Sequence, residues 1–186
     1  GTKVITQIEG HNLESFGFMK FDFLGLSNLT IIHKSLELIK KFKGENINID
    51  QIPLDDKETF KLFQRGATTA VFQFESEGMK KYLRELKPTE FEDLIFMNAA
   101  YRPGPMSCIP DYIKRKFGQQ KVTYLHPKLK PILEKTYGFP VYQEQILRIA
   151  VDMAGYSLGE ADLLRRAMGK KKKEIMEVEK KKFIKG

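Results

Sequence analysis

The chain has only one cysteine, Cys108, and three histidines among its 186 residues. A single cysteine excludes an internal disulfide framework and is compatible with a reducing compartment. So few scattered cysteine and histidine ligands also argue against a structural zinc site. No run of about 18 apolar residues occurs, so nothing in the sequence is expected to span a membrane. We expect a cytoplasmic protein without a membrane partner.

The N-terminus lacks both an initiating methionine and the pattern of a secretory signal peptide. This suggests an excised fragment, although removal of a tag would leave the same N-terminal glycine. A hydrophobic content of 41% and a charged content of 30% are typical of a globular protein. The length suffices for one domain with a sizeable core, or for one domain plus a piece of another.

The net charge of +8 is unevenly distributed. Residues 170–186 contain eight lysines and three glutamates, so five of the eight net charges lie in this segment. A strongly basic segment favours a polyanionic partner, whereas the alternative is a solvated, solubilising surface.

Apolar periodicity and capping signals predict a mainly helical chain. The expected helices are Ser27–Lys43, ended by Gly44; Asp55 or Asp56 to Arg65; 75–87, stopped before Pro88; a helix capped by Thr89 and Glu92 that reaches Ala99 or Ala100; one ending near Phe117; Pro127–Lys135; Tyr142–Ala154; and one capped by Ser157 and Glu160 that ends at Gly169. The phenylalanines expected in the core are Phe42, Phe60, Phe63, Phe91 and Phe96.

Two segments, 16–24 and 68–74, are expected to be strands or extended. In a strand at 16–24, Lys20 and Asp22 would share one face, about 6–7 Å apart. Such a pair suits a site in which a carboxylate binds a hard cation and an ammonium group binds phosphate. The structural alternative is an ion pair at a sheet edge.

Six motifs favour the site over the structural ion pair, because in this order they are similar to those of a known family. The motifs are "KFDFLGL", "TTAVFQFESEGM", "ELKPTEFEDLI", "YRPGP", "YGFPVYQEQILRIA" and "GYSLGEADLLRRAMGKKK". With these motifs the chain resembles the family of bacterial DNA polymerase III alpha subunits over essentially its whole length. The resemblance implies a short β element at 1–26 that ends the palm, followed by a multi-helix fingers domain at 27–186.

The resemblance also implies residue roles. Asp22 would be one of three carboxylates that hold two catalytic Mg²⁺ ions, and Lys20 would contact the triphosphate. The motif that carries the other two carboxylates is absent from these 186 residues. One aspartate cannot fill two metal coordination shells, so the chain by itself is expected not to polymerise DNA.

Arg165 and Arg166 are expected in the last turn of the helix that follows Ser157. They would serve as C-terminal helix cations paired with Asp162, or as guanidinium forks for the triphosphate of an incoming nucleotide. The resemblance favours the triphosphate and, by a small margin, Arg166. Arg102 lies in a loop stiffened by Pro103 and Pro105, which suits a phosphate contact; a plain helix connector is the alternative.

Lys170 and Lys171 are expected to contribute phosphate contacts that carry no sequence preference. The partners implied by the family are primer–template DNA, an incoming dNTP and other replicase subunits, in the bacterial cytoplasm near the nucleoid. The alternative from another class is a non-enzymatic, basic helical module that binds nucleic acid independently of nucleotide and Mg²⁺.

Overall fold

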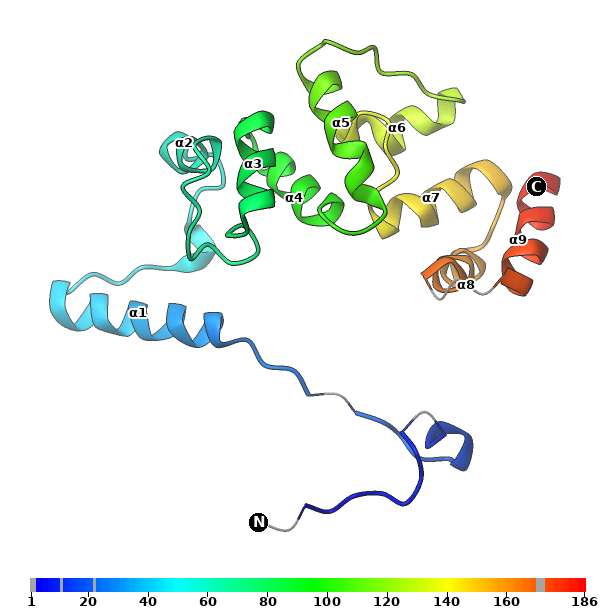
Figure 1. Cartoon of the computed structure of the whole chain (residues 1–186), viewed down its shortest axis with the longest axis horizontal. Coiled ribbons are helices and arrows are strands. Elements are labelled where there is room, and N and C mark those ends of the chain that lie inside the picture. The colour runs from blue at the N-terminus through cyan, green and yellow to red at the C-terminus, as the bar shows by residue number, and fades with distance from the viewer. Residues whose placement is uncertain (1–2, 11, 22, 170–172) are drawn as a thin grey trace. The chain divides into compact units, whose positions relative to one another are not determined.

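The computed structural model of the chain describes residues 3–10, 12–21, 23–169 and 173–186. The chain divides into two compact units, Gly1–Ile52 and Pro53–Gly186. Within the described residues every regular element is a helix (Figure 1). The expected mainly α-helical fold is therefore confirmed.

The α-helices are α1 (Ser27–Lys43), α2 (Lys57–Gln64), α3 (Glu77–Leu86), α4 (Phe91–Ala100), α5 (Ile109–Lys116), α6 (Lys130–Leu133), α7 (Gln143–Ala154), α8 (Leu158–Gly169) and α9 (Lys173–Lys185). Short 3-10 turns η1 to η5 lie at Glu14–Phe16, Ile49–Gln51, Pro105–Cys108, Pro127–Leu129 and Glu134–Thr136. None of the helices formed by these described segments is long and apolar enough to cross a membrane.

Unit 1 contains α1 but no core. Gly44 ends this helix as predicted, in the left-handed conformation that glycine adopts without strain. No side chain of α1 is buried, and five of its apolar residues are exposed by 45–74%. These exposed residues are Leu29, Ile31, Ile32, Leu38 and Phe42. The prediction that Phe42 is a core residue is therefore wrong for this chain.

The segment expected to form the palm strand contains no strand among its described residues. Glu14–Phe16 is a 3-10 turn, and residues 18–21 and 23–26 have no regular secondary structure. A strand requires the backbone groups of a neighbouring strand, and the described part of the chain offers none. Asp22, the predicted catalytic carboxylate, lies outside the described residues.

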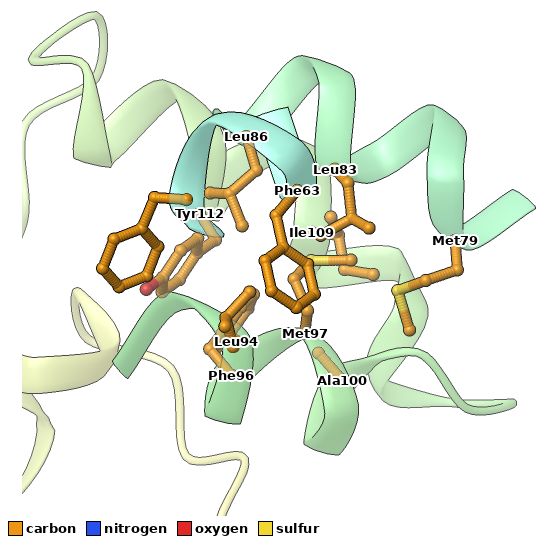
Figure 2. Packing of buried hydrophobic residues seen from close by; sticks show 11 residues of the cluster. Phe63, Met79, Leu83, Leu86, Leu94, Phe96, Met97, Ala100, Ile109 and Tyr112 are labelled. Atoms are coloured by element: carbon orange, nitrogen blue, oxygen red, sulfur yellow. The ribbon is translucent and has the colours of Figure 1, made fainter. Parts of the chain in front are cut away.

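The first core of unit 2 lies among α2, α3, α4 and α5 (Figure 2). Side chains from all four helices meet there, including the fully buried Leu83, Leu86 and Phe96. Phe96 stacks on Tyr112, with ring centroids 3.4 Å apart. The predictions that Phe60, Phe63 and Phe96 are core residues are confirmed. Phe91 is 43% exposed, so its assignment to the core is wrong.

The second core joins α7, α8 and α9, which lie side by side (Figure 1). Ala150, Ala154 and Ala161 are buried where α7 meets α8, and these small side chains let the two backbones approach closely. Tyr156 fills the space toward α9. Leu158 and Met168 on α8 are 76% and 43% exposed, so neither belongs to this core.

Two local predictions in unit 2 need correction. Segment 68–74 forms consecutive turns, because Ala70 and Gln73 have φ angles of 64° and 66° that no strand accommodates. The capping interaction expected from Glu92 at the start of α4 is instead made by Asp93, one residue later. The buried carboxylate of Asp93 accepts hydrogen bonds from the backbone N–H groups of Thr89 and Glu90.

Candidate functional site

An open cleft of about 760 Å³ lies in unit 2 between three segments that are distant in the sequence. The segments are the proline loop after α4, the start of α7 and the end of α8. Its lining residues are Pro103, Pro105, Pro140, Val141, Tyr142, Gln143, Ile146, Arg165, Arg166, Met168 and Gly169. The two arginines are the charged residues of this lining, and both are positive.

The start of α8 is fixed by a capping box, as predicted. The Glu160 carboxylate accepts hydrogen bonds from the backbone N–H and the hydroxyl of Ser157, at 2.9 and 3.0 Å. Burial of Ala161, Leu164 and Ala167 then orients the helix against its neighbours. Arg165 and Arg166 consequently lie in the last turns of α8, at the cleft.

Arg165 links α8 to α7. Its Nε donates a hydrogen bond to Asp162 Oδ1 at 2.9 Å, and a second guanidinium nitrogen lies 2.8 Å from the same oxygen. Its third nitrogen donates to the side-chain oxygen of Gln143 at 2.9 Å. Only 29% of the Arg165 side chain is exposed, so this guanidinium is held in place from two helices.

Arg166 shares the carboxylate of Asp162 but is held by one contact. Its Nε lies 2.7 Å from Asp162 Oδ2, and 64% of the side chain is exposed. Its terminal nitrogens donate no hydrogen bond to any described residue. The hydrogen bond from Arg165 and the charge of Arg166 lower the pKa of Asp162. The helix-cation arrangement expected with Asp162 is therefore present, and Arg166 retains donors for an anion.

The N-terminus of α7 opens on the same cleft. Buried Gln145 fixes it: its amide oxygen accepts the N–H groups of Val141 and Tyr142, and its amide nitrogen donates to Ile132 O and Thr136 Oγ1. The backbone N–H groups of Gln143 and Glu144 donate to no described residue. A helix N-terminus carries partial positive charge, which adds to the charge of the arginines.

The loop "YRPGP" forms the opposite side of the cleft. Gly104 adopts φ +105°, a conformation that other residues rarely reach, between Pro103 and Pro105. Tyr101 packs against the first core, beside the ring of Tyr82. Arg102 is exposed, and its side chain makes no hydrogen bond or ion pair to a described residue. The loop thus presents an exposed guanidinium next to the lining prolines.

Of the remaining predicted site residues, Lys20 belongs to the described part of the chain. Lys20 is exposed in unit 1. Lys170 and Lys171, like Asp22, lie outside the described residues. Among the described residues, no three His, Cys, Asp or Glu side chains gather as a metal site. The described residues alone therefore do not supply the carboxylates that two Mg²⁺ ions require.

Comparison with known proteins decides the family. The model of the bacterial DNA polymerase III alpha subunit finger domain matches residues 28–186. The chain belongs to this family. It is 52% identical over 186 residues to DNA polymerase III subunit alpha of Halalkalibacterium halodurans, and 50% identical over 185 residues to that of Staphylococcus aureus. Each alignment covers 100% of the chain but 17% of the relative.

Within this finger domain the structure adds residues that sequence reasoning had not assigned to the site. Asp162 was expected only as an ion-pair partner, and no site role was assigned to Gln143. The spacing of Asp162 three and four residues before the arginines was a usable signal. Gln143 is 22 residues from Arg165, and no local pattern could have joined them.

Proposed function

We propose that the cleft between α7, α8 and the proline loop binds the triphosphate of an incoming dNTP within a full-length DNA polymerase III alpha subunit. The observation that carries this proposal is the convergence of Arg165, Arg166 and the α7 N-terminus on one cleft. A triphosphate is strongly anionic, and the side chains lining this cleft carry no negative charge. The reaction would be nucleotidyl transfer from dNTP to the 3′ end of a primer.

The arginines would act by electrostatic stabilisation. Guanidinium groups bind phosphate oxygens through paired N–H donors, and they retain their charge throughout the reaction. As pyrophosphate leaves, negative charge grows on its oxygens, and fixed positive groups stabilise that state most. Exposed Arg102 would add a further guanidinium from the proline loop, with Lys170 and Lys171 contributing beyond the end of α8.

Residues 1–26 would complete the palm of the full-length enzyme, with the fingers at 27–186. Asp22 would join carboxylates from elsewhere in that enzyme to hold two Mg²⁺ ions, and Lys20 would contact the triphosphate. The metal ions, when bound, supply charge neutralisation and activation of the primer 3′ oxygen. This assignment supports a division of labour in which the fingers hold the nucleotide and the palm performs the chemistry.

Primer–template DNA is the proposed macromolecular partner, with other replicase subunits contacting parts of the enzyme outside this chain. On α9, the side chains of Lys180, Lys181 and Lys185 are exposed and have no hydrogen bond or ion pair to a described residue. Such lysines bind phosphates without reading sequence, as a replicative enzyme requires. The proposed location is the bacterial cytoplasm, associated with the nucleoid.

The test compares two exposed helical arginines in the full-length polymerase. Arg166 pairs with Asp162 at the cleft, whereas Arg148 pairs with Asp152 on α7 away from its lining. We expect Arg166→Ala to raise the KM for dNTP about tenfold, because a charged hydrogen bond contributes roughly 1.5–3 kcal/mol. Arg148→Ala should leave KM unchanged. An equal KM for both variants and the wild type would refute the proposal.

The palm assignment has its own test. Asp22→Asn in the full-length polymerase should abolish turnover while primer–template affinity is kept, because the amide removes a charged metal ligand. The 186-residue chain alone should not extend a primer in the presence of Mg²⁺ and dNTPs. Unchanged turnover of the Asp22 variant would instead favour a non-catalytic, DNA-binding role for this segment.

A further inference from the structure

The carboxylate of Asp162 lies between the two arginines of the cleft. Its Oδ1 accepts Arg165 and its Oδ2 faces Nε of Arg166. We propose that Asp162 is the positioning residue that orients both guanidinium groups for the triphosphate. This inference rests on the proposed function of the cleft and deepens it.

The contacts assign different parts to the two arginines. Arg165 is anchored by Asp162 on its own helix and by Gln143 on α7, so its guanidinium is fixed across the helix pair. Arg166 is restrained only at Nε, and its two terminal nitrogens donate no hydrogen bond to a described residue. Arg165 would thus be a fixed part of the cleft lining. Arg166 would be restrained at Nε and would keep its terminal nitrogens for the phosphate oxygens.

If Asp162 acted on the triphosphate only through its charge, its carboxylate would oppose binding, because both are negative. The Asp162 carboxylate offsets one of the two positive charges, so these three side chains carry a net charge of +1. Replacing the carboxylate by a neutral group would double that charge and strengthen the attraction for a triphosphate. If Asp162 orients the arginines, neutralising it should weaken triphosphate binding. If only the net charge matters, neutralising it should strengthen binding, so the direction of the change in affinity decides between the two.

Ordinary helix stabilisation is the competing account. Exposed pairs three or four residues apart stabilise helices only weakly, and Arg148–Asp152 on α7 is such a pair, with 3.5 Å between its charged atoms. The Asp162 site differs because one carboxylate holds two guanidinium groups and one of these reaches a second helix. Asp152 therefore provides a matched control.

The experiment is steady-state kinetics of the full-length polymerase with Asp162→Asn, an isosteric change. An amide has one carbonyl oxygen and therefore holds at most one of the two guanidinium groups. We expect the KM for dNTP to rise about tenfold, which is the scale of a lost charged hydrogen bond. The Kd for primer–template and the Tm should stay unchanged, and Asp152→Asn should leave all three values unchanged.

A lower or unchanged KM for Asp162→Asn would overturn the inference, because attraction alone or helix stabilisation would then suffice. Asp162→Glu keeps the charge and should recover most of the affinity for dNTP; failure to recover any would also count against positioning. The proposed function fails separately, if Arg166→Ala leaves the KM for dNTP at the wild-type value. If Arg166→Ala raises KM while Asp162→Asn does not, the cleft binds nucleotide and Asp162 does not position it.

Discussion

Unit 1 and unit 2 both contain regular α-helices, but helices of unit 2 bury side chains and the α-helix of unit 1 does not. The 17-residue helix α1 is the longest in the described chain and buries no side chain. The 10-residue helix α3 buries Met79, Leu83 and Leu86. Caps and periodicity define both helices, whereas burial depends on neighbouring elements that only unit 2 provides. Contacts between elements therefore stabilise unit 2, whereas α1 has no buried side chain that would contribute such contacts.

The largest difference in the free energy of unfolding is expected between variants of a buried charged contact and of an exposed one. Asp93 is fully buried with Lys116, whereas the pair His33–Glu37 on α1 is exposed. Asp93→Ala leaves a buried ammonium without its partner and should lower the free energy of unfolding by about 3–5 kcal/mol. Glu37→Ala should cost less than about 1 kcal/mol. Urea denaturation of the 186-residue chain measures both, and equal costs would contradict the contrast.

Apolar truncation should give the next largest difference. Leu83 is fully buried in the first core, so Leu83→Ala should cost about 2–5 kcal/mol through lost contacts and a cavity. Leu38 on α1 is 53% exposed, so Leu38→Ala should change stability by less than about 0.5 kcal/mol. The same denaturation experiment compares them. A large effect at Leu38 would show that α1 packs against a partner in solution.

Two glycines provide a smaller contrast. A Cβ at Gly78 would lie 2.1 Å from the hydroxyl oxygen of Tyr101, whereas one at Gly25 meets nothing within 4 Å. Gly78→Ala must shift the Tyr101 ring, which packs against the first core, and should cost about 1–3 kcal/mol. Gly25→Ala should be nearly neutral. Thermal unfolding followed by circular dichroism compares the variants, and an unchanged Tm for Gly78→Ala would contradict the packing.

The smallest effect is an acid-sensitive contact in unit 2. The hydrogen bond from Lys182, followed by those from Ser157, lowers the pKa of Glu160 from 4.5 to about 2. A lowered folded-state pKa stabilises the fold above pH 4.5, and this stabilisation is lost as the pH falls toward 2. The protection factors of the α9 amides, which compare the measured exchange rate with the intrinsic rate at each pH, should therefore fall over this range. Lys182→Met should flatten the dependence; an identical profile would contradict it.

Local sequence signals predicted helices well and their environment poorly. The bounds of α1 and the capping of α8 were predicted from spacing, because each depends on residues within one turn. The exposure of Phe42 and Phe91 was not, since periodicity cannot tell whether a partner element covers the apolar face. The turns at 68–74 were missed because no local pattern predicts positive φ angles at Ala70 and Gln73. The hydroxyl of buried Thr68 donates a hydrogen bond to the carbonyl oxygen of Phe74, which closes this segment of turns.

For the candidate site, the motif arginines were predicted but their setting was not. Arg165 and Arg166 stand out in the sequence, and the resemblance to a family supplied a role for them. The cleft itself depends on the meeting of segments around 104, 143 and 166, which lie some tens of residues apart. Gln143 gains its part only through that meeting, because its partner Arg165 lies on another helix.

The most direct test of the nucleotide cleft is equilibrium binding of dNTP to the full-length polymerase on a primer with a blocked 3′ end, which separates binding from chemistry. Replacing both Arg165 and Arg166 by alanine should weaken dNTP binding at least about tenfold, on the scale of lost charged hydrogen bonds. Arg148→Ala should bind as the wild type does. Equal dNTP affinity of the double variant and the wild type would contradict the assignment of the cleft.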